Sequence, residues 1–407
     1  MFNNLEEIDL LIKQHEAYRQ QCLNLIASEN YSSQTVRNYL TSDLGNRYGC
    51  YAGVDLTARE YRGNRYIQEL EAKTQKLVGE VFKADYVDLR PVSGHVAGIA
   101  TILGLLSPGD LVLEIHLRDW GHGMAQLMVG APHFGQTLEF DDIPFDQNRI
   151  VDLAMLIGKM QECRPAMVIF GGSGMLFPEP VAEIKAVAEK MGILVAHDSS
   201  HVTGLIAGGV YPNPLDQGAD IMFGSTHKSF PGPQGGFIAT RDFNIYERVG
   251  NVLASLVTSH HLNRLPALAV GMLEMKEFGK AYGEQIIRNS KTLGKAMEEA
   301  GLTVIGATKG YSETHLILVD VSKYGSGVHI SKILESSDIL CSDDFGQLDR
   351  ELRIGTAEVT RRGMEEQEMK RIADFFKRLI IEQENPEQIK EEVNLFASKY
   401  SGCRYSL

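Results

Sequence analysis

Lys228 and Asp198 are the two residues whose types and positions could do covalent chemistry. Each follows an apolar run that predicts a buried strand, ILVAH before Asp198 and DIMFGSTH before Lys228. The ligand crevice of an open α/β sheet lies at the carboxyl ends of its strands. A partly desolvated amine there can form a Schiff base with an aldehyde, and an acid can keep a heterocyclic nitrogen protonated. Taken singly, each residue has a simpler interpretation, a solvated lysine or the N-cap of a helix.

An amine and an acid at neighbouring strand ends are together what a pyridoxal phosphate site requires. The lysine binds the aldehyde, and the acid keeps the pyridine nitrogen protonated so that the ring can accept electrons. A phosphate cradle is also required, and Ser93-Gly94-His95, placed before an apolar helix, has the necessary composition. Glycine lets the backbone approach closely, and a helix N-terminus offers free N–H groups and a positive dipole end. Ser225 and His227 could add contacts from the neighbouring strand end.

The elements that must position these residues alternate between helix and strand from about residue 65 onward. Apolar residues at three- and four-residue spacing predict helices over 65–82, 94–106 and 180–192, the last closed by Gly192. Strand–helix alternation with fully apolar strands indicates an α/β fold, a mostly parallel sheet with helices on both faces. The predicted strands lie at 85–91, 110–115, 166–172, 193–200, 220–225 and 235–240.

The pattern changes after about residue 265 to longer helices with a few strands. This change predicts a large domain over 61–265 and a smaller C-terminal α+β domain over 266–407. Residues 1–60 are too short for a core of their own, so we expect an arm that packs on the main domain or on a partner subunit.

Composition and charge exclude several classes of protein. The chain has 407 residues, 43% hydrophobic and 23% charged, as in an ordinary globular protein. Its formal charge of 40 − 53 = −13 argues against broad nucleic-acid binding. No apolar stretch is long enough to span a membrane, and the N-terminus lacks a signal-peptide pattern. The five cysteines are scattered without metal-ligand or redox spacing, so we expect reduced thiols, no metal site and a cytoplasmic location.

Segments along most of the chain resemble the serine hydroxymethyltransferase family. The resemblance implies a fold-type-I pyridoxal-phosphate-dependent transferase that acts at the Cα of an amino acid, assembled as a homodimer or a larger oligomer. The block STHKSFPGPQGG, residues 225–236, is highly specific. The other segments are LIASENYSS (25–33), FKADYVDLRPVSG (82–94), LSPGDLVL (106–113), HDSSHVTGLIAGGVYPNP (197–214) and LRIGTAEVTRRG (352–363).

The resemblance implies specific roles around the cofactor. Lys228 would form the Schiff base, Asp198 would pair with the pyridine nitrogen, and His122 would stack on the ring. The resemblance also implies Ser200 beneath the ring, and Ser173 and His201 near the phenolic oxygen of the ring. The residues that would bind the phosphate, from the resemblance or from the strand ends, are Ser93, Gly94, His95, Ser225 and His227.

Four further residues would serve the substrate according to the same resemblance. Arg353 would bind the amino acid's carboxylate in a bidentate pair, which lysine could not reproduce, and Ser28 would assist there. Tyr48 and Tyr61 match two tyrosines that the family places at the active site, across a dimer interface.

The first active-site loop departs from the family pattern. Cys50 stands where the family has a glutamate that handles the substrate's hydroxyl proton and contacts folate, and several extra residues follow. Asp55 or Glu60 could replace that glutamate, because a catalytic carboxylate needs only to lie within hydrogen-bond reach of its proton. A reactive thiolate at Cys50 is the alternative, beside an inert neighbouring thiol.

Two later segments also differ from the family. Ser259, His260 and His261 lie where a partner's phosphate is normally contacted, so they could donate to it, shape a different substrate pocket or lie on the surface. Asp343 and Asp344 replace a motif near the folate tail, and acids repel a glutamylated folate. Tetrahydrofolate therefore stays open as a second cofactor.

The function predicted from the sequence is serine/glycine hydroxymethyl transfer or a related aldol cleavage. The alternative keeps pyridoxal phosphate without folate, as in a threonine-type aldolase or transaldolase, an α-methylserine-type transferase, a racemase or an aminotransferase. A second class is a non-catalytic relative that binds a partner or RNA. The presence of Lys228, Asp198 and Arg353 together argues against this class. The amino acid, the aldehyde, the stereochemistry and the choice of dimer or tetramer stay open.

Overall fold

The structure, a computed structural model, describes residues 2–129, 138–345 and 347–407. The chain forms two compact units, a large unit of residues 32–284 and 405–407 and a small unit of residues 1–31 and 285–404. These units differ from the predicted domain ranges: residues 32–60 and 266–284 belong with the large unit, whereas residues 1–31 belong with the C-terminal part. There β1 (Leu23–Asn24) pairs in parallel with β11 (Ile339–Leu340).

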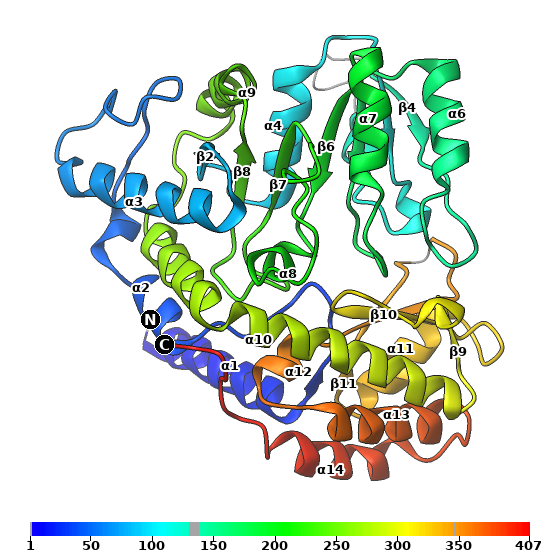
Figure 1. The fold of residues 1–407 in the computed structure, drawn as a ribbon. Coiled ribbons are helices and arrows are strands. Elements are labelled where there is room, and N and C mark those ends of the chain that lie inside the picture. Colours follow the sequence, from blue (N-terminus) through cyan, green and yellow to red (C-terminus); the bar gives the residue numbers. More distant parts are fainter. Residues whose placement is uncertain (1, 130–137, 346) are drawn as a thin grey trace. The chain divides into compact units, whose positions relative to one another are not determined.

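A seven-stranded sheet forms the centre of the large unit (Figure 1). All neighbouring pairs from β7 to β4 are parallel, whereas β8 runs antiparallel to both β2 and β7. The mostly parallel sheet predicted from the sequence is thereby confirmed. In sheet order the strands are β2 (Tyr86–Asp88), β8 (Gly236–Thr240), β7 (Ile221–Ser225), β6 (Leu194–Asp198), β5 (Met167–Phe170), β3 (Leu111–Glu114) and β4 (Glu139–Asp142).

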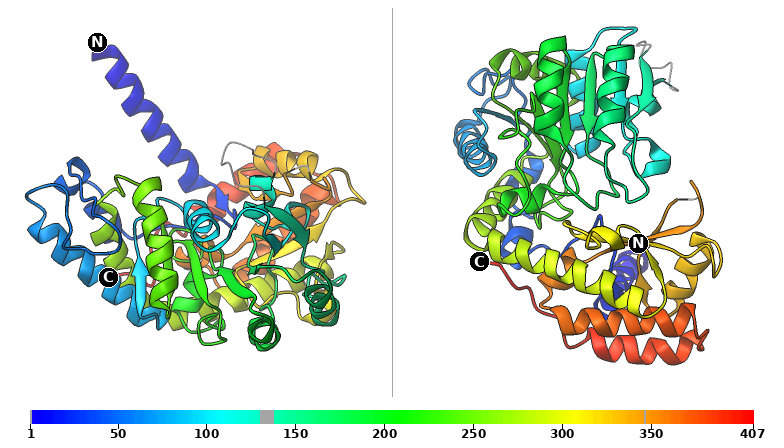
Figure 2. Two further views of the ribbon diagram at one scale, coloured as in Figure 1. Left: turned by 90° about the horizontal axis from the view of Figure 1, so that it is seen from above. Right: turned by 45° about the vertical axis from the view of Figure 1, so that its right-hand side comes forward.

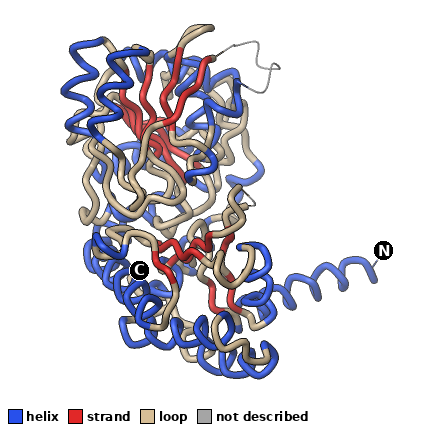
Figure 3. The backbone as a smooth tube through the Cα atoms, turned by 90° about the vertical axis from the view of Figure 1, so that its right-hand side faces the viewer, coloured by secondary structure: helices blue, strands red, loops and turns tan. Residues whose placement is uncertain are grey.

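Helices cover both faces of this sheet, as Figures 1 and 3 show. Alternate residues of β5 enter two different cores, Met167 and Ile169 one and Val168 and Phe170 the other. A strand buried on both faces must be apolar at every position, which explains the unbroken apolar runs. The first core includes α4 (Gly94–Leu105), α5 (Met124–Val129) and α9 (Phe243–Leu256), and the second includes α6 (Leu153–Cys163) and α7 (Val181–Met191).

Local signals set the helix boundaries in the large unit. Helix α3 spans Arg65–Phe82 as predicted, and α7 ends at Met191 with Gly192 as its C-cap, whose φ of 71° is left-handed. The remaining elements of this unit are α2 (Gln34–Tyr39), α8 (Thr203–Ala207), the first part of α10 (Arg264–Glu299) and the 3₁₀ turns Asp43–Asn46 and Leu117–Asp119.

The small unit contains a four-stranded antiparallel sheet packed against helices, which is the predicted α+β character. Its strands, in sheet order, are β12 (Ser342–Asp343), β13 (Glu351–Gly355), β10 (Leu316–Asp320) and β9 (Thr303–Val304). Its helices are α1 (Phe2–Gln21), α11 (Gly327–Ser336), α12 (Ala357–Arg361), α13 (Glu366–Ile380), α14 (Pro386–Ala397), the end of α10 and the 3₁₀ turn Ala307–Lys309.

Among the residues that the structure describes, no helix has the length and apolar character needed to cross a membrane.

Candidate active site

The structure brings Lys228 and Asp198 together at the carboxyl ends of two central strands of the large sheet. Asp198 is the last residue of β6, and the neighbouring parallel strand β7 ends at Ser225, three residues before Lys228. Asp198 is only 2% exposed, and the positive charge of Lys228 contributes to lowering the pKa of its carboxyl group. The two side chains on which the predicted chemistry depends therefore belong to one cluster.

Asp198 is held as a carboxylate by the groups around it. Burial alone would raise its pKa, but the charge and hydrogen bond of His122 and the charge of Lys228 together hold the pKa well below the usual range. His122 Nδ1 lies 2.5 Å from Asp198 Oδ2, and the Ser200 N–H donates to Oδ1 at 2.9 Å. The His122 ring also stacks against His201, with centroids 5.5 Å apart and planes at 26°. A fixed buried anion results, which is the group that a protonated pyridine nitrogen needs.

The predicted phosphate cradle lies at the N-terminus of α4, beside the same strand ends. The Ser93 hydroxyl caps this helix by accepting from Val96 N at 3.2 Å. A Cβ added to Gly94 would lie 2.5 Å from Ser225 Oγ and 2.6 Å from Ser200 Oγ, so only glycine leaves room here. Hydroxyls, helix N–H groups and a backbone open to close approach suit a phosphate dianion.

The histidines beside the cradle are kept neutral. Burial, with the charge of Lys228, lowers the pKa of His227 to about 4, and burial and the charge of His122 lower that of His95. His227 Nδ1 and His122 Nε2 are buried and have no hydrogen-bond partner within the described part of the chain. Buried polar atoms of this kind need a partner, and a ring and phosphate placed among them would supply it. The residues present therefore fit pyridoxal phosphate.

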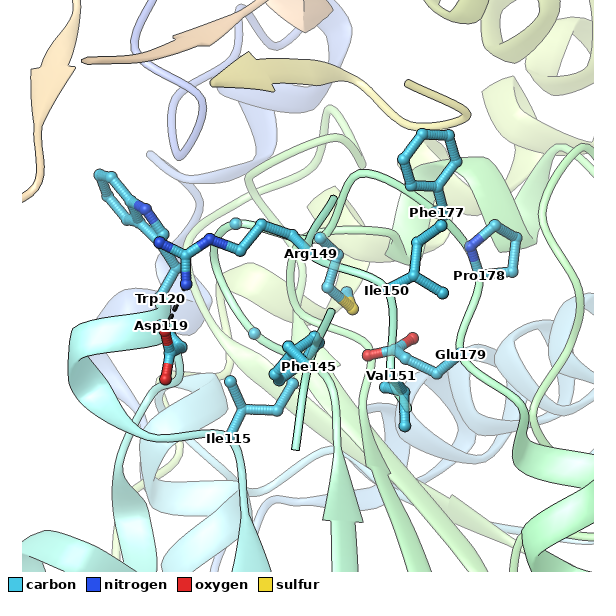
Figure 4. A pocket seen from close by; sticks show the side chains of 13 residues that line it. Ile115, Asp119, Trp120, Phe145, Arg149, Ile150, Val151, Phe177, Pro178 and Glu179 are labelled. Carbon is cyan, nitrogen blue, oxygen red and sulfur yellow. Dashed lines mark hydrogen bonds and ion pairs between the residues drawn. The ribbon is translucent and has the colours of Figure 1, made fainter. Parts of the chain in front are cut away.

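Ser173 is fixed by the loop that carries His122. The Ser173 N–H and hydroxyl both donate to the Trp120 carbonyl oxygen, at 2.6 and 3.1 Å. Beside this contact lies a cavity of about 20 Å³, whose lining includes the Arg149–Asp119 ion pair (Figure 4). That volume accommodates about one water molecule, so this cavity is too small for an amino acid.

A buried network centred on Glu179, which the sequence analysis missed, supports the strand ends below the site. Glu179 Oε1 accepts from Gly171 N at 2.9 Å, while Oε2 accepts from the Tyr211 hydroxyl at 2.9 Å and lies 3.3 Å from His197 Nε2. These contacts link the ends of β5 and β6. An isolated glutamate in a loop carries no sequence signal for such a role.

Glu114, at the carboxyl end of β3, was also missed. It is 1% exposed, and its two oxygens accept from the N–H groups of Met124 and Ala125, both at 2.9 Å. It thereby fixes the segment that directly follows His122. Burial raises the pKa of Glu114 to about 7, although these backbone hydrogen bonds act in the opposite direction.

We expect Glu114 to make stability fall as pH rises. Below its ordinary pKa of 4.5 the group is protonated in both states and has no effect; between 4.5 and about 7 the folded state retains a proton that the unfolded state loses. The loss is complete above about 7 and amounts to about 3 kcal/mol. In Glu114→Gln holoenzyme the fall in Tm between pH 5 and pH 8 should therefore be smaller than in wild type. Glu139→Gln, which changes an exposed residue of β4, is the control, and an unchanged pH dependence in Glu114→Gln would contradict the assignment.

The small unit holds the residues predicted to bind the substrate carboxylate. Arg353 lies in β13, is 2% exposed, and has its guanidinium 5.5 Å from the Phe345 ring. Burial lowers its pKa to about 10, so it stays cationic at neutral pH. Ser28 follows Ala27, which packs against Gly355 at the end of the same strand. Arg353 is therefore the central residue of β13, and the segment that carries Ser28 packs against the last residue of that strand.

Tyr48 and Tyr61 lie together on the large unit, with ring centroids 5.4 Å apart and each side chain 51% exposed.

His260 does not lie where a phosphate could reach it, because it is 1% exposed and its Nε2 is 3.0 Å from Glu71 Oε1. The expectation that it donates to a phosphate or shapes a substrate pocket is therefore wrong, whereas His261 is exposed.

Comparison with known proteins identifies the family. The model of the family "Serine hydroxymethyltransferase" matches residues 3–376. The chain belongs to the serine hydroxymethyltransferase family. The serine hydroxymethyltransferase of Staphylothermus marinus is 38% identical over 99% of this chain and 93% of its own length, and that of Methanocella arvoryzae is 40% identical over 94% and 92%.

A solved structure extends this result to the fold. The crystal structure of L-threonine transaldolase from Pseudomonas fluorescens in its internal aldimine state matches with a TM-score of 0.89 and 27% identity, over 100% of this chain and 96% of that one. Family membership and this likeness confirm a fold-type-I pyridoxal-phosphate-dependent enzyme of the serine hydroxymethyltransferase type.

Proposed function

We propose that this enzyme cleaves the Cα–Cβ bond of a β-hydroxy amino acid, with serine/glycine hydroxymethyl transfer as the leading reaction. The observation that carries the proposal is the Lys228–Asp198–His122 cluster at the sheet edge. Pyridoxal phosphate bound there supplies an acceptor for the electron pair of a broken bond at Cα. Asp198 holds the pyridine nitrogen protonated, and Lys228 supplies the amine that holds the aldehyde.

Arg353 selects which bond breaks. A guanidinium that binds the carboxylate through two hydrogen bonds fixes rotation about the bond between Cα and nitrogen. By fixing that rotation, Arg353 would decide which of the bonds at Cα is presented for cleavage. Ser28 assists at the same carboxylate, and the neutral His95 and His227 donate to the phosphate.

Replacing Arg353 with lysine should weaken amino-acid binding while the cofactor stays bound. Lysine keeps the charge but loses the two-pronged geometry, and losing a charge-assisted hydrogen bond costs about 1.5–3 kcal/mol. We expect KM for serine to rise by roughly ten- to a hundredfold, with the visible absorbance of the bound cofactor unchanged. Arg350→Lys, an exposed neighbour, is the control, and an unaltered KM in Arg353→Lys would contradict the role.

We propose that two copies of the chain share their active sites. The exposed apolar residues Leu5, Ile8 and Ile12 repeat at helical spacing on α1, which extends from the small unit in Figure 2. Tyr48 and Tyr61 are also half exposed. Residues that complete the active site of a partner subunit would be exposed in this way in a single copy of the chain.

The scattered cysteines support a cytoplasmic location.

The proposed reaction is tested by supplying holoenzyme with L-serine, with and without tetrahydrofolate, and measuring glycine. Serine turnover that requires folate supports hydroxymethyl transfer. The second candidate, threonine-type aldolase or transaldolase, is favoured by the likeness to the transaldolase and by the loss of the family glutamate at Cys50. It predicts acetaldehyde release from L-threonine without folate. Failure to cleave either amino acid would reject the proposal.

A further inference from the structure

The loop that departs from the family pattern lies between α2 and α3 (Figure 1), and hydrogen bonds around one isolated β-bridge pair its two arms as a short hairpin. Cys50 O accepts from Glu60 N at 3.3 Å, and Tyr51 and Arg59 form an antiparallel bridge one step further in. The turn closes over residues 55–58, where Ala58 N donates to Asp55 O at 3.0 Å. The inserted residues therefore have a defined register that sets Glu60 directly opposite Cys50.

This register sorts the side chains onto two faces. Side chains of directly opposed residues share a face, and the next pair points the other way. Tyr51 and Arg59 turn inward and are 2% and 9% exposed. Cys50 and Glu60 turn outward, and the Cys50 thiol donates to Glu60 Oε2 at 3.5 Å. The hairpin thus places a carboxylate beside position 50, adjacent in the chain to Tyr61.

The inward face anchors the hairpin through buried charges. Arg59 Nη2 donates to Glu71 Oε2 at 2.7 Å, and the other oxygen of Glu71 lies 3.0 Å from His260 Nε2. The guanidinium groups of Arg59 and Arg90 both lie over the Tyr51 ring, with their carbons 4.7 and 4.5 Å from its centroid. A segment held by buried ion pairs and cation–π contacts presents its outer face in a fixed position.

We propose that Glu60 carries the proton of the substrate's β-hydroxyl group, in place of a glutamate at position 50. The inference rests on the proposed cleavage of a β-hydroxy amino acid. Asp55 does not have this placement, because it lies in the turn, where its carboxylate accepts from the N–H and hydroxyl of Thr57 at 2.8 and 2.7 Å. Cys50 is a poor candidate too, since burial, together with the Glu60 carboxylate, raises the pKa of its thiol.

Transfer of the hydroxyl proton to Glu60 and cleavage of the Cα–Cβ bond need no co-reactant other than solvent. The Glu60 carboxylate accepts the proton of the hydroxyl O–H, the oxygen forms the second bond of an aldehyde carbonyl, and the Cα–Cβ bond breaks. Its electron pair stays on the Cα side, where a proton from solvent completes glycine, and Glu60 releases the proton it accepted to solvent. In the reverse direction Glu60 returns its proton to the new hydroxyl group.

The test compares Glu60→Gln with Asp55→Asn, two charge-removing changes on exposed side chains of the same hairpin. For Glu60→Gln we expect cleavage of the β-hydroxy amino acid to fall by about 10²- to 10⁴-fold, the range for loss of a general acid–base group. The visible absorbance of the bound cofactor and the affinity for glycine, which has no hydroxyl group, should stay as in wild type. Asp55→Asn should stay within about twofold of wild type, since asparagine keeps the turn's acceptor.

Glu60→Asp, with a shorter side chain, should recover part of the lost rate. Undiminished cleavage in Glu60→Gln would overturn the inference while leaving the proposed function standing, as would an equal loss in Asp55→Asn. Loss of glycine binding in Glu60→Gln would also overturn it, because the residue would then act in binding. A wild-type enzyme that cleaves no β-hydroxy amino acid overturns both proposals.

Discussion

Lys228→Ala holoenzyme is expected to lose the visible absorbance of the Schiff base and to cleave serine about a thousandfold or more slowly, a loss of about 4 kcal/mol. The physical reason is that alanine has no amine to bond to the cofactor's aldehyde, although the phosphate cradle at Ser93 and Gly94 is intact. Absorbance and initial rate are measured on one preparation. Lys185→Ala, which removes a partly buried lysine paired with Asp220, is the control for loss of an ion pair in the same unit.

A Lys228→Ala protein with an unchanged spectrum would reject the amine's role. The same variant tests the shared site when mixed and refolded with Tyr61→Ala. If Tyr61 acts across the interface, each mixed dimer has one site with both residues intact, and activity exceeds that of either parent. If mixing and refolding the two variants restores no activity, the proposal that two copies share their active sites is contradicted.

Asp198→Asn is expected to keep the Schiff base but lower kcat by about 10²- to 10³-fold, the range for removing one preorganised electrostatic partner. Asparagine has nearly the same shape but no charge, so it cannot stabilise a protonated pyridine nitrogen. It also leaves His122 and Lys228 beside a neutral group in a buried site. The measurement is kcat under saturating serine, together with the absorbance.

Asp220→Asn is the matched control for Asp198→Asn. Asp220 directly precedes β7 at the opposite end from the site, and it pairs with Lys185 at 2.6 Å. Its replacement should lower Tm with little change in kcat. If Asp198→Asn behaved in the same way, a purely structural role would follow and the assignment would fail.

The sequence alone predicted the elements that lie close to the site. Helix 65–82 was predicted to the residue, because helical periodicity and the residues at its ends are local signals. The strands ending at Asp198 and Ser225 were predicted because burial on both faces requires an unbroken apolar run. Parallel strands must end at the same edge of a sheet, so the meeting of Asp198 and Lys228 followed from these local patterns.

Other features depended on how distant segments pack, which local patterns do not contain. Residues 1–31 belong with the small unit because β1 pairs with β11, more than three hundred residues away. Glu114 and Glu179 look like ordinary charged residues, and only burial gives them roles. The position of Glu60 beside Cys50 required the hairpin register, which the buried Arg59–Glu71 pair fixes. The sequence determines which side chains can do chemistry and which strands carry them, whereas the tertiary structure decides which carboxylates support them, because long-range packing brings those groups within hydrogen-bond distance.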